Sequence, residues 1–148
     1  MIIRLMKACD YEKVFELWTS TPGVGMRSLD DSEAGIMKFL KRNPCTCFIA
    51  EPQDSDKSGG IAGVILSGHD GRRGYIYHAV VREEFRGTGI GRRLVQAVED
   101  SMKQEGINKL ALVAFAANKN GNCFWEHLGY NTRPDIVYRN KSINEKNI

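Results

Sequence analysis

The chain has 148 residues, of which 42% are hydrophobic and 26% are charged. This length fits one domain, and the apolar content is too high for a disordered chain. A net charge of +3 is too small to indicate nucleic-acid binding by itself. No apolar run approaches the roughly 18 residues of a membrane span, and the N-terminus does not look like a secretory signal. We therefore expect a cytoplasmic globular protein with no membrane or nucleic-acid partner.

The spacing of apolar residues predicts a succession of short elements in the first half of the chain. We expect a strand over 1–7, a helix after Asp10, a second helix begun by residues 30–32 and ended by Asn43-Pro44, and strands over 47–50, 61–66 and 74–81. The polar stretch 52–59 lies between two of these strands, so it predicts a hairpin connection.

Helical spacing returns after the last of these strands. We expect a helix from about Ile90 to Gly106, a strand over 110–115, a helix capped by Asn118 or Asn120 and closed by Gly129, and a final strand at Val137-Tyr138. Residues 1–140 would then form one domain, and the polar tail 141–148 is expected to fray. This order of elements predicts a mixed α/β or α+β fold around one sheet.

The most informative segment is the glycine-rich stretch 86–92, between a strand and a helix. Gly87, Gly89 and Gly91 let the backbone approach a bulky ligand and let successive N–H groups point the same way. The following helix adds about half a positive charge at its N-terminus. Nearby arginines add full charges: Arg82, Arg86, Arg92 and Arg93. The segment therefore predicts a phosphate or pyrophosphate site.

Two common phosphate motifs do not fit this stretch. A P-loop needs Gly-Lys-Ser/Thr, which the sequence lacks. The dinucleotide fingerprint also fails, because its third glycine falls on Arg92. The alternative, a tight strand-to-helix turn with solvated arginines, stays open on glycine spacing alone.

The stretch from Arg86 to Gly91 matches the Arg/Gln-x-x-Gly-x-Gly/Ala signature, and the chain resembles the GNAT superfamily of acyl-CoA N-acyltransferases. A second segment, from Asn118 to Tyr130, also resembles the family at the expected separation. The resemblance covers most of the chain and includes the order of the elements. It implies a mixed central sheet of about six to seven strands, mostly antiparallel, with about four flanking helices and a splayed strand pair.

The resemblance also implies acetyl-CoA as co-substrate. The pyrophosphate would bind to the backbone of the glycine-rich stretch, and the pantetheine arm would run beside the preceding strand and Asn118. Trp125 is either a core residue or a lid on that arm. The implied coenzyme-binding residues are Ala79, Val80, Val81, Arg86, Gly87, Thr88, Gly89, Ile90, Gly91, Arg92, Asn118 and Trp125.

The implied reaction is acetyl transfer to a primary amine of a small molecule, protein or peptide, by direct attack through a tetrahedral intermediate. A backbone N–H near Val80 or Val81 would stabilise the oxyanion. The second reading is a non-catalytic acyl-CoA sensor, because two family features are missing. Trp125 stands where many members have a tyrosine acid, which leaves water, Tyr130, another residue or no acid at all.

The second missing feature is a carboxylate on the strand before the signature. The candidates for catalysis there are Tyr77 and His78, and period two predicts that they face opposite sides of the sheet. An imidazole titrates near neutral pH, which suits a base, although a core histidine satisfied by its neighbours stays an alternative. Asp70, with His69, is a weaker candidate in a turn, where ordinary turn chemistry is the alternative.

The connection between the two early helices is the expected acceptor side. Arg27 is a candidate clamp for an acceptor carboxylate, and an ammonium group could be held by Asp30, Asp31 or Glu33. The alternative is a connector whose acidic residues cap the second helix. We expect no metal site, and four free cysteine thiols, with Cys123 as a small buried residue. A homodimer is possible.

Overall fold

The protein is described by a computed structural model over residues 1–53 and 60–148. The strands are β1 Ile2–Leu5, β2 Phe48–Glu51, β3 Gly63–His69, β4 Gly74–Val81 and β5 Leu110–Leu112. The helices are α1 Tyr11–Ser20, α2 Glu33–Arg42, α3 Ile90–Gln104 and α4 Lys119–His127, with short 3₁₀ turns at Ala8–Asp10 and Glu83–Phe85. Most of the hairpin connection expected over 52–59 lies outside the described residues.

One mixed sheet with strand order β1-β2-β3-β4-β5 forms the centre of the molecule. Its first three pairings are antiparallel, and β5 lies parallel to β4. The expected mixed, mostly antiparallel sheet with four helices is confirmed, although the described residues form five strands rather than six to seven. The final strand predicted at Val137-Tyr138 is not formed. Both side chains are exposed, and a three-residue β5 offers little edge for pairing.

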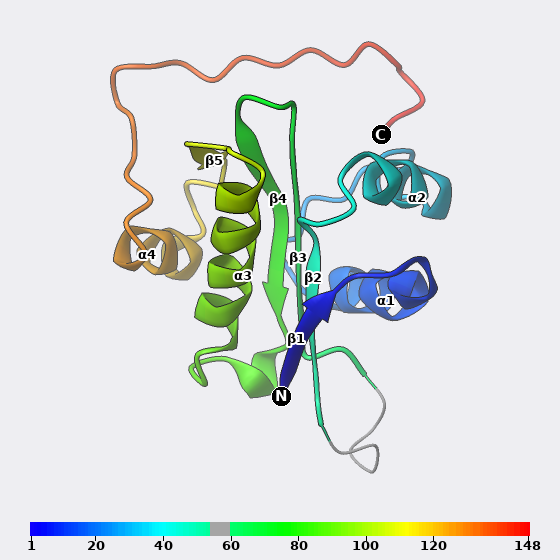
Figure 1. Cartoon of the computed structure of the whole chain (residues 1–148). Coiled ribbons are helices and arrows are strands. Elements are labelled where there is room, and N and C mark those ends of the chain that lie inside the picture. The colour runs from blue at the N-terminus through cyan, green and yellow to red at the C-terminus, as the bar shows by residue number, and fades with distance from the viewer. Residues whose placement is uncertain (54–59) are drawn as a thin grey trace.

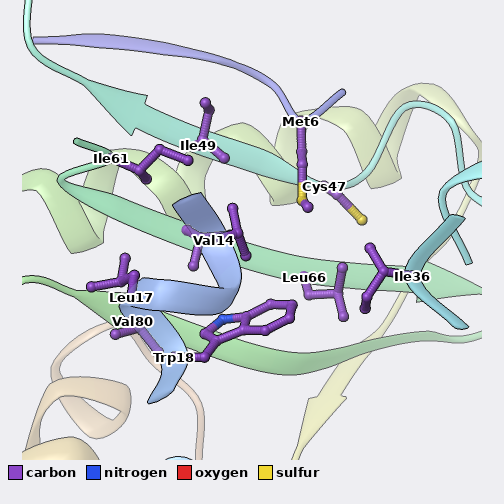
Figure 2. Packing of buried hydrophobic residues seen from close by; sticks show 11 residues of the cluster. Met6, Val14, Leu17, Trp18, Ile36, Cys47, Ile49, Ile61, Leu66 and Val80 are labelled. Carbon is purple, nitrogen blue, oxygen red and sulfur yellow. The ribbon is translucent and has the colours of Figure 1, made fainter. Parts of the chain in front are cut away.

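The helices cover the two faces of the sheet in pairs (Figure 1). Helices α1 and α2 pack on one face, where Val14, Leu17 and Trp18 of α1 meet Ile36 of α2. Helix α3 packs on the other face with its stripe of Leu94, Val95, Val98 and Met102, and α4 adds its partly buried aromatic residues there. Figure 2 shows the first cluster, in which Trp18 lies with Val80 of β4 and Leu66 of β3.

A β-bulge interrupts β4 at the middle of its pairing with β3. Leu66 is opposite His78, but the next residue along β3, Ser67, is opposite Ile76, so Tyr77 is the extra residue. Ile76 packs in the cluster under α3, whereas both Tyr77 and His78 contact aromatic residues from the α1 and α2 side. The period-two prediction that Tyr77 and His78 face opposite sides is therefore wrong.

The C-terminal residues return to the connection between α1 and α2 (Figure 1). The backbone N–H of Ser28 donates to Ile148 O at 2.7 Å, and Asn147 Oδ1 accepts from Leu29 N at 3.0 Å. These contacts differ from the frayed tail expected over 141–148. None of the helices in the described part of the chain combines the length and apolar character that a bilayer crossing requires.

Candidate active site

The glycine loop, residues 86–92, joins β4 to α3 through two left-handed positions. Gly87 has φ +75° and Gly89 has φ +85°, and a Cβ atom added at either would meet no heavy atom within 4 Å. A non-glycine residue at such a φ is strained, and the open space means that a ligand can approach the backbone directly. Thr88 fixes the loop from within, because its hydroxyl donates to Phe85 O at 2.6 Å.

The N-terminus of α3 presents free amides beside this loop. Arg93 N–H makes the first bond of the helix, to Gly89 O at 3.1 Å. The N–H groups of Ile90, Gly91 and Arg92 precede it and have no hydrogen-bond partner in the described part of the chain. Such a terminus attracts anions through its unpaired donors and its helix dipole. The geometry fits the predicted diphosphate site.

Only part of the expected arginine charge lies at the loop. Arg86 lines the groove and donates from Nε to Val81 O at 3.1 Å, and Arg92 lines it too. Arg82 is turned toward Ile61 O at 3.2 Å, and Arg93 toward Met1 O at 3.3 Å. The expected four-arginine cluster is thus reduced to two arginines at the groove.

Strands β4 and β5 separate after three residue pairs. Their register runs from Gly74 opposite Leu110 to Ile76 opposite Leu112, while β4 continues to Val81. Arg82 N–H still donates to Ala62 O on the β3 side, so the alternation of backbone groups turns the N–H of Val81 to the open edge. This is the splayed pair expected from the resemblance, and it favours Val81 over Val80 as an outward-facing donor.

A continuous groove of about 2390 Å³ follows the splayed edge. One end, the loop end, is lined by the glycine loop with Asn118 and Trp125; the other, the histidine end, by His78, Tyr77, Asp31 and the connection between α1 and α2. This volume exceeds the roughly 300–1,000 Å³ of a common small-molecule pocket. Of the predicted coenzyme-binding residues, only Thr88 does not line it.

Helix α4 forms a wall of the loop end. Asn118 caps it, because its Oδ1 accepts from Gly121 N at 2.9 Å. Trp125 is half-buried, with its ring edge-on to Phe124 at 5.0 Å and to Tyr130 at 5.2 Å, and it also lines the groove. Trp125 therefore packs on the α3 cluster and faces the ligand space at once. The expected burial of Cys123 is wrong, since this thiol is exposed and lies 3.4 Å from His127 Nδ1.

Tyr130 does not take the place of the missing tyrosine acid. Its hydroxyl donates to Glu99 Oε1 of α3 at 3.0 Å, and it does not line the groove. Burial and then the Glu99 carboxylate raise the pKa of the phenol well above its usual range. The phenol thus stays protonated, but it is bonded to Glu99 and is not among the residues that line the groove.

The histidine end contains a pair that the sequence did not predict. His78 Nε2 lies 2.7 Å from Asp31 Oδ1, and the two side chains are only 14% and 7% exposed. The Trp18 ring lies against the imidazole with its centroid 4.9 Å away. Asp31 comes from 47 residues earlier in the chain, so no local spacing signals the contact. The sequence marked both residues as candidates but for separate roles.

Tyr77 is more exposed and lies beside the pair. The residue is 55% exposed, and its ring packs edge-on against Phe39 of α2 at 5.4 Å. Partial burial and the neighbouring groups Tyr138 and Asp30 raise the pKa of its hydroxyl. Tyr77 therefore lines the groove as a neutral phenol.

The predicted acceptor-binding residues separate into two places. Arg27 and Asp30 line the histidine end, where Asn147 donates to Asp30 Oδ2 at 2.7 Å. Asp70 lies outside the groove, in the turn after β3, and accepts from Arg72 N at 2.8 Å and Arg73 N at 2.7 Å. These bonds lower the pKa of its carboxyl, as in an ordinary Asx turn. The role predicted for Asp70 is thus not supported.

Comparison with known proteins agrees with this geometry. The family model described as "Acetyltransferase (GNAT) family" matches residues 10–130. An acetyltransferase of Yersinia enterocolitica, YE1169, is 30% identical over 143 residues, which cover 97% of this chain and 96% of that protein.

Two solved structures share the fold. A structure of the NatC complex bound to Gag peptide and CoA aligns with a TM-score of 0.72 at 21% identity, covering 86% of this chain and 82% of that one. The aminoglycoside N-acetyltransferase AAC(6')-Iy in complex with CoA aligns with a TM-score of 0.71 at 17% identity, covering 95% and 99%. At these identities the likeness is one of fold. The family match spans most of the sequence, and the chain belongs to the GNAT acetyltransferase family.

Proposed function

We propose that this protein is an N-acetyltransferase that moves the acetyl group of acetyl-CoA to a primary amine of a small molecule or peptide. One observation carries the proposal: the open glycine loop and the His78–Asp31 pair line the same groove. An anion site alone would fit many ligands. The His78 imidazole, paired with Asp31, adds a side chain of the kind that serves in acid–base catalysis.

The residues of the loop end fit a diphosphate with a long uncharged arm. The free amides at the start of α3 would hold the phosphates, with Arg86 and Arg92 beside them. The open edge of β4 would pair with the amide groups of the arm, and Val81 N–H would donate to the carbonyl oxygen of the acetyl group. When bound, acetyl-CoA supplies an activated acetyl thioester.

The residues of the histidine end fit an amine acceptor. A lysine-type ammonium has a pKa near 10.4, so its neutral form costs about 4.6 kcal/mol at pH 7 and benefits from a base. His78 and Tyr77 are the groups in place, and Asp30 adds a carboxylate for the ammonium. Of the two solved structures that share the fold, one contains a bound peptide and the other is named as an aminoglycoside N-acetyltransferase. Peptides and aminoglycosides both carry amino groups.

A panel of amines tests this proposal. The purified protein is mixed with acetyl-CoA and, separately, with polyamines, aminoglycosides, amino acids and short peptides, and free CoA thiol is followed by a thiol-reactive dye. We expect thiol release above the hydrolysis background with at least one amine class, and an acetylated amine by mass spectrometry. Binding of CoA without release for any amine would favour the non-catalytic sensor instead.

A further inference from the structure

We propose that Asp31 is a positioning residue that holds His78 as the general base for the acceptor amine, an inference that rests on the proposed function. Both side chains line the histidine end of the groove. Their contact joins the connection before α2 to the middle of β4. The β-bulge at Tyr77 is what turns His78 toward this side of the sheet.

The contact fixes which ring nitrogen can take a proton. An ionised carboxylate only accepts hydrogen bonds, so His78 Nε2 at 2.7 Å must carry the hydrogen. The lone pair of the neutral ring is then on Nδ1. Among residues 1–53 and 60–148, no group forms a hydrogen bond with Nδ1. The contact with Asp31 therefore holds the imidazole in the tautomer that has its hydrogen on Nε2 and its lone pair on Nδ1, where a proton can be accepted.

Both members of the pair are held by neighbouring residues. Arg27 N–H donates to its other carboxylate oxygen, Oδ2, at 2.6 Å. The hydroxyl of Tyr11 donates to the carbonyl oxygen of Asp31 at 2.9 Å, which ties the connection to α1. The Trp18 ring, 1% exposed, blocks one side of the imidazole. A preorganised pair of this kind pays little reorganisation cost when the base acts.

Asp31 is the residue that bonds directly to the His78 imidazole, although other polar groups lie nearby. Asp31 is contacted by Tyr11 of α1 and by the backbone of Arg27, and Glu33 of α2 lies near Tyr11. Next to His78 on β4 stands Tyr77, with Asp30 and Tyr138 near it. Opposite His78 on β3 lies the apolar Leu66. Within the described part of the chain, only the Asp31 carboxylate is within hydrogen-bond distance of the ring.

The proton and electron balance is complete without a further reactant. The acceptor ammonium gives one proton to His78 Nδ1, and the freed nitrogen lone pair attacks the acetyl carbonyl carbon. A C–N bond forms and the C–S bond breaks, with its electron pair leaving on the CoA sulfur. The second nitrogen proton passes to that sulfur, and His78 returns its proton to solvent.

The variants Asp31→Asn and His78→Gln test the pair through kinetics on the responsive amine. In Asp31→Asn the amide oxygen can keep the Arg27 bond, so the NH₂ group donates to Nε2 and forces the hydrogen onto Nδ1. We expect kcat to fall at least tenfold for Asp31→Asn and about 100-fold for His78→Gln. The KM for acetyl-CoA should change less than threefold in both, because the loop end is intact.

Asp100→Asn is the control. It removes the same charge from an exposed position of α3, and Asp100 neither lines the groove nor contacts the pair. It should leave turnover and the acid limb of the pH–rate profile where the unaltered protein has them. Asp31→Asn should displace or remove that limb. Imidazole added to His78→Ala should restore part of the turnover, which a purely structural role would not allow.

The outcomes separate the two proposals. If the unaltered protein acetylates an amine while Asp31→Asn keeps its kcat and its acid limb, the role of Asp31 is wrong and the proposed function stands. If His78→Gln also keeps full turnover, the histidine base is wrong as well. If the unaltered protein binds CoA but acetylates no amine, the proposed function itself is overturned, and the pair with it.

Discussion

The loop end of the groove is made largely of backbone, whereas the histidine end is made of side chains from distant segments. The loop end depends on two left-handed glycines and the first amides of α3, all within seven consecutive residues. The histidine end brings together α1, the connection before α2 and β4, and Asp31 and His78 are 47 positions apart in the sequence. A backbone site tolerates many side chains, but a side-chain site depends on each residue present.

The largest expected effect is at the loop end, from Gly89→Glu. The new carboxylate would stand where the diphosphate is proposed to bind, and like charges about 4 Å apart repel by about 4 kcal/mol at a protein surface. We expect CoA affinity to fall at least 100-fold by isothermal titration. The variant also forces a side chain into φ +85°.

Gly106→Glu is the matched control for that strain. Gly106 has φ +73° with equally open space, but it lies beyond the C-terminal end of α3. It should lower the melting temperature about as much as Gly89→Glu and leave CoA affinity unchanged. Equal loss of affinity in the two variants would mean that backbone strain, rather than the proposed site, explains the result.

The second prediction concerns the ion pairs of Arg4, which lie outside the groove. Arg4 donates to both Asp10 oxygens at 2.8 Å and to Glu51 at 2.9 Å. Arg4→Met leaves two carboxylates without their partner, and we expect the free energy of unfolding to fall by about 2 kcal/mol in urea. CoA affinity should stay within twofold. A stability within 0.5 kcal/mol of the unaltered protein, roughly the limit for an ordinary surface substitution, would contradict this prediction.

The same network predicts a pH dependence of stability. Burial alone would raise the pKa of the Asp10 carboxyl, but hydrogen bonds from Arg4 and the Lys7 backbone outweigh it and lower that pKa. The stabilisation is therefore present above the unfolded pKa of about 3.9 and is lost as the pH falls through the lower folded value. Urea unfolding from pH 6 down to pH 3 should show this loss, and Arg4→Met should show a shallower one.

The smallest effect is expected at Tyr77, which lines the histidine end and has no hydrogen-bond partner for its hydroxyl among the described residues. The pKa of a phenol is ordinarily near 10, and burial raises that of Tyr77 further, so its hydroxyl is protonated at neutral pH and is a poor base. Tyr77→Phe keeps the ring against Phe39, and turnover should stay within threefold. A drop of more than tenfold in kcat would transfer the catalytic role from His78 to Tyr77.

This contrast also explains what the sequence could predict. The glycine loop is local, so the spacing from Gly87 to Gly91 and the helical period after Ile90 were enough to predict an anion site that the geometry fits. The β-bulge at Tyr77 has no such signal, because it arises from the pairing with β3. A prediction that does not include the bulge places Tyr77 and His78 on opposite faces of the sheet, and it therefore cannot predict the contact between His78 and Asp31.

Other differences have the same origin. The strand predicted at Val137-Tyr138 needs an edge to pair with, and β5 provides only Leu110–Leu112. Cys123 was expected to be a small buried residue, but it is exposed on α4, next to His127. Local pattern predicted the elements well, whereas the partners of single side chains depended on tertiary contacts.

A crystal structure of the protein with bound CoA tests the central claim most directly. We predict that the diphosphate oxygens lie within about 3.2 Å of the N–H groups of residues 87–92. The arm should run along the open edge of β4 toward His78. A structure in which the glycine loop binds no phosphate and CoA occupies another part of the surface would contradict the account.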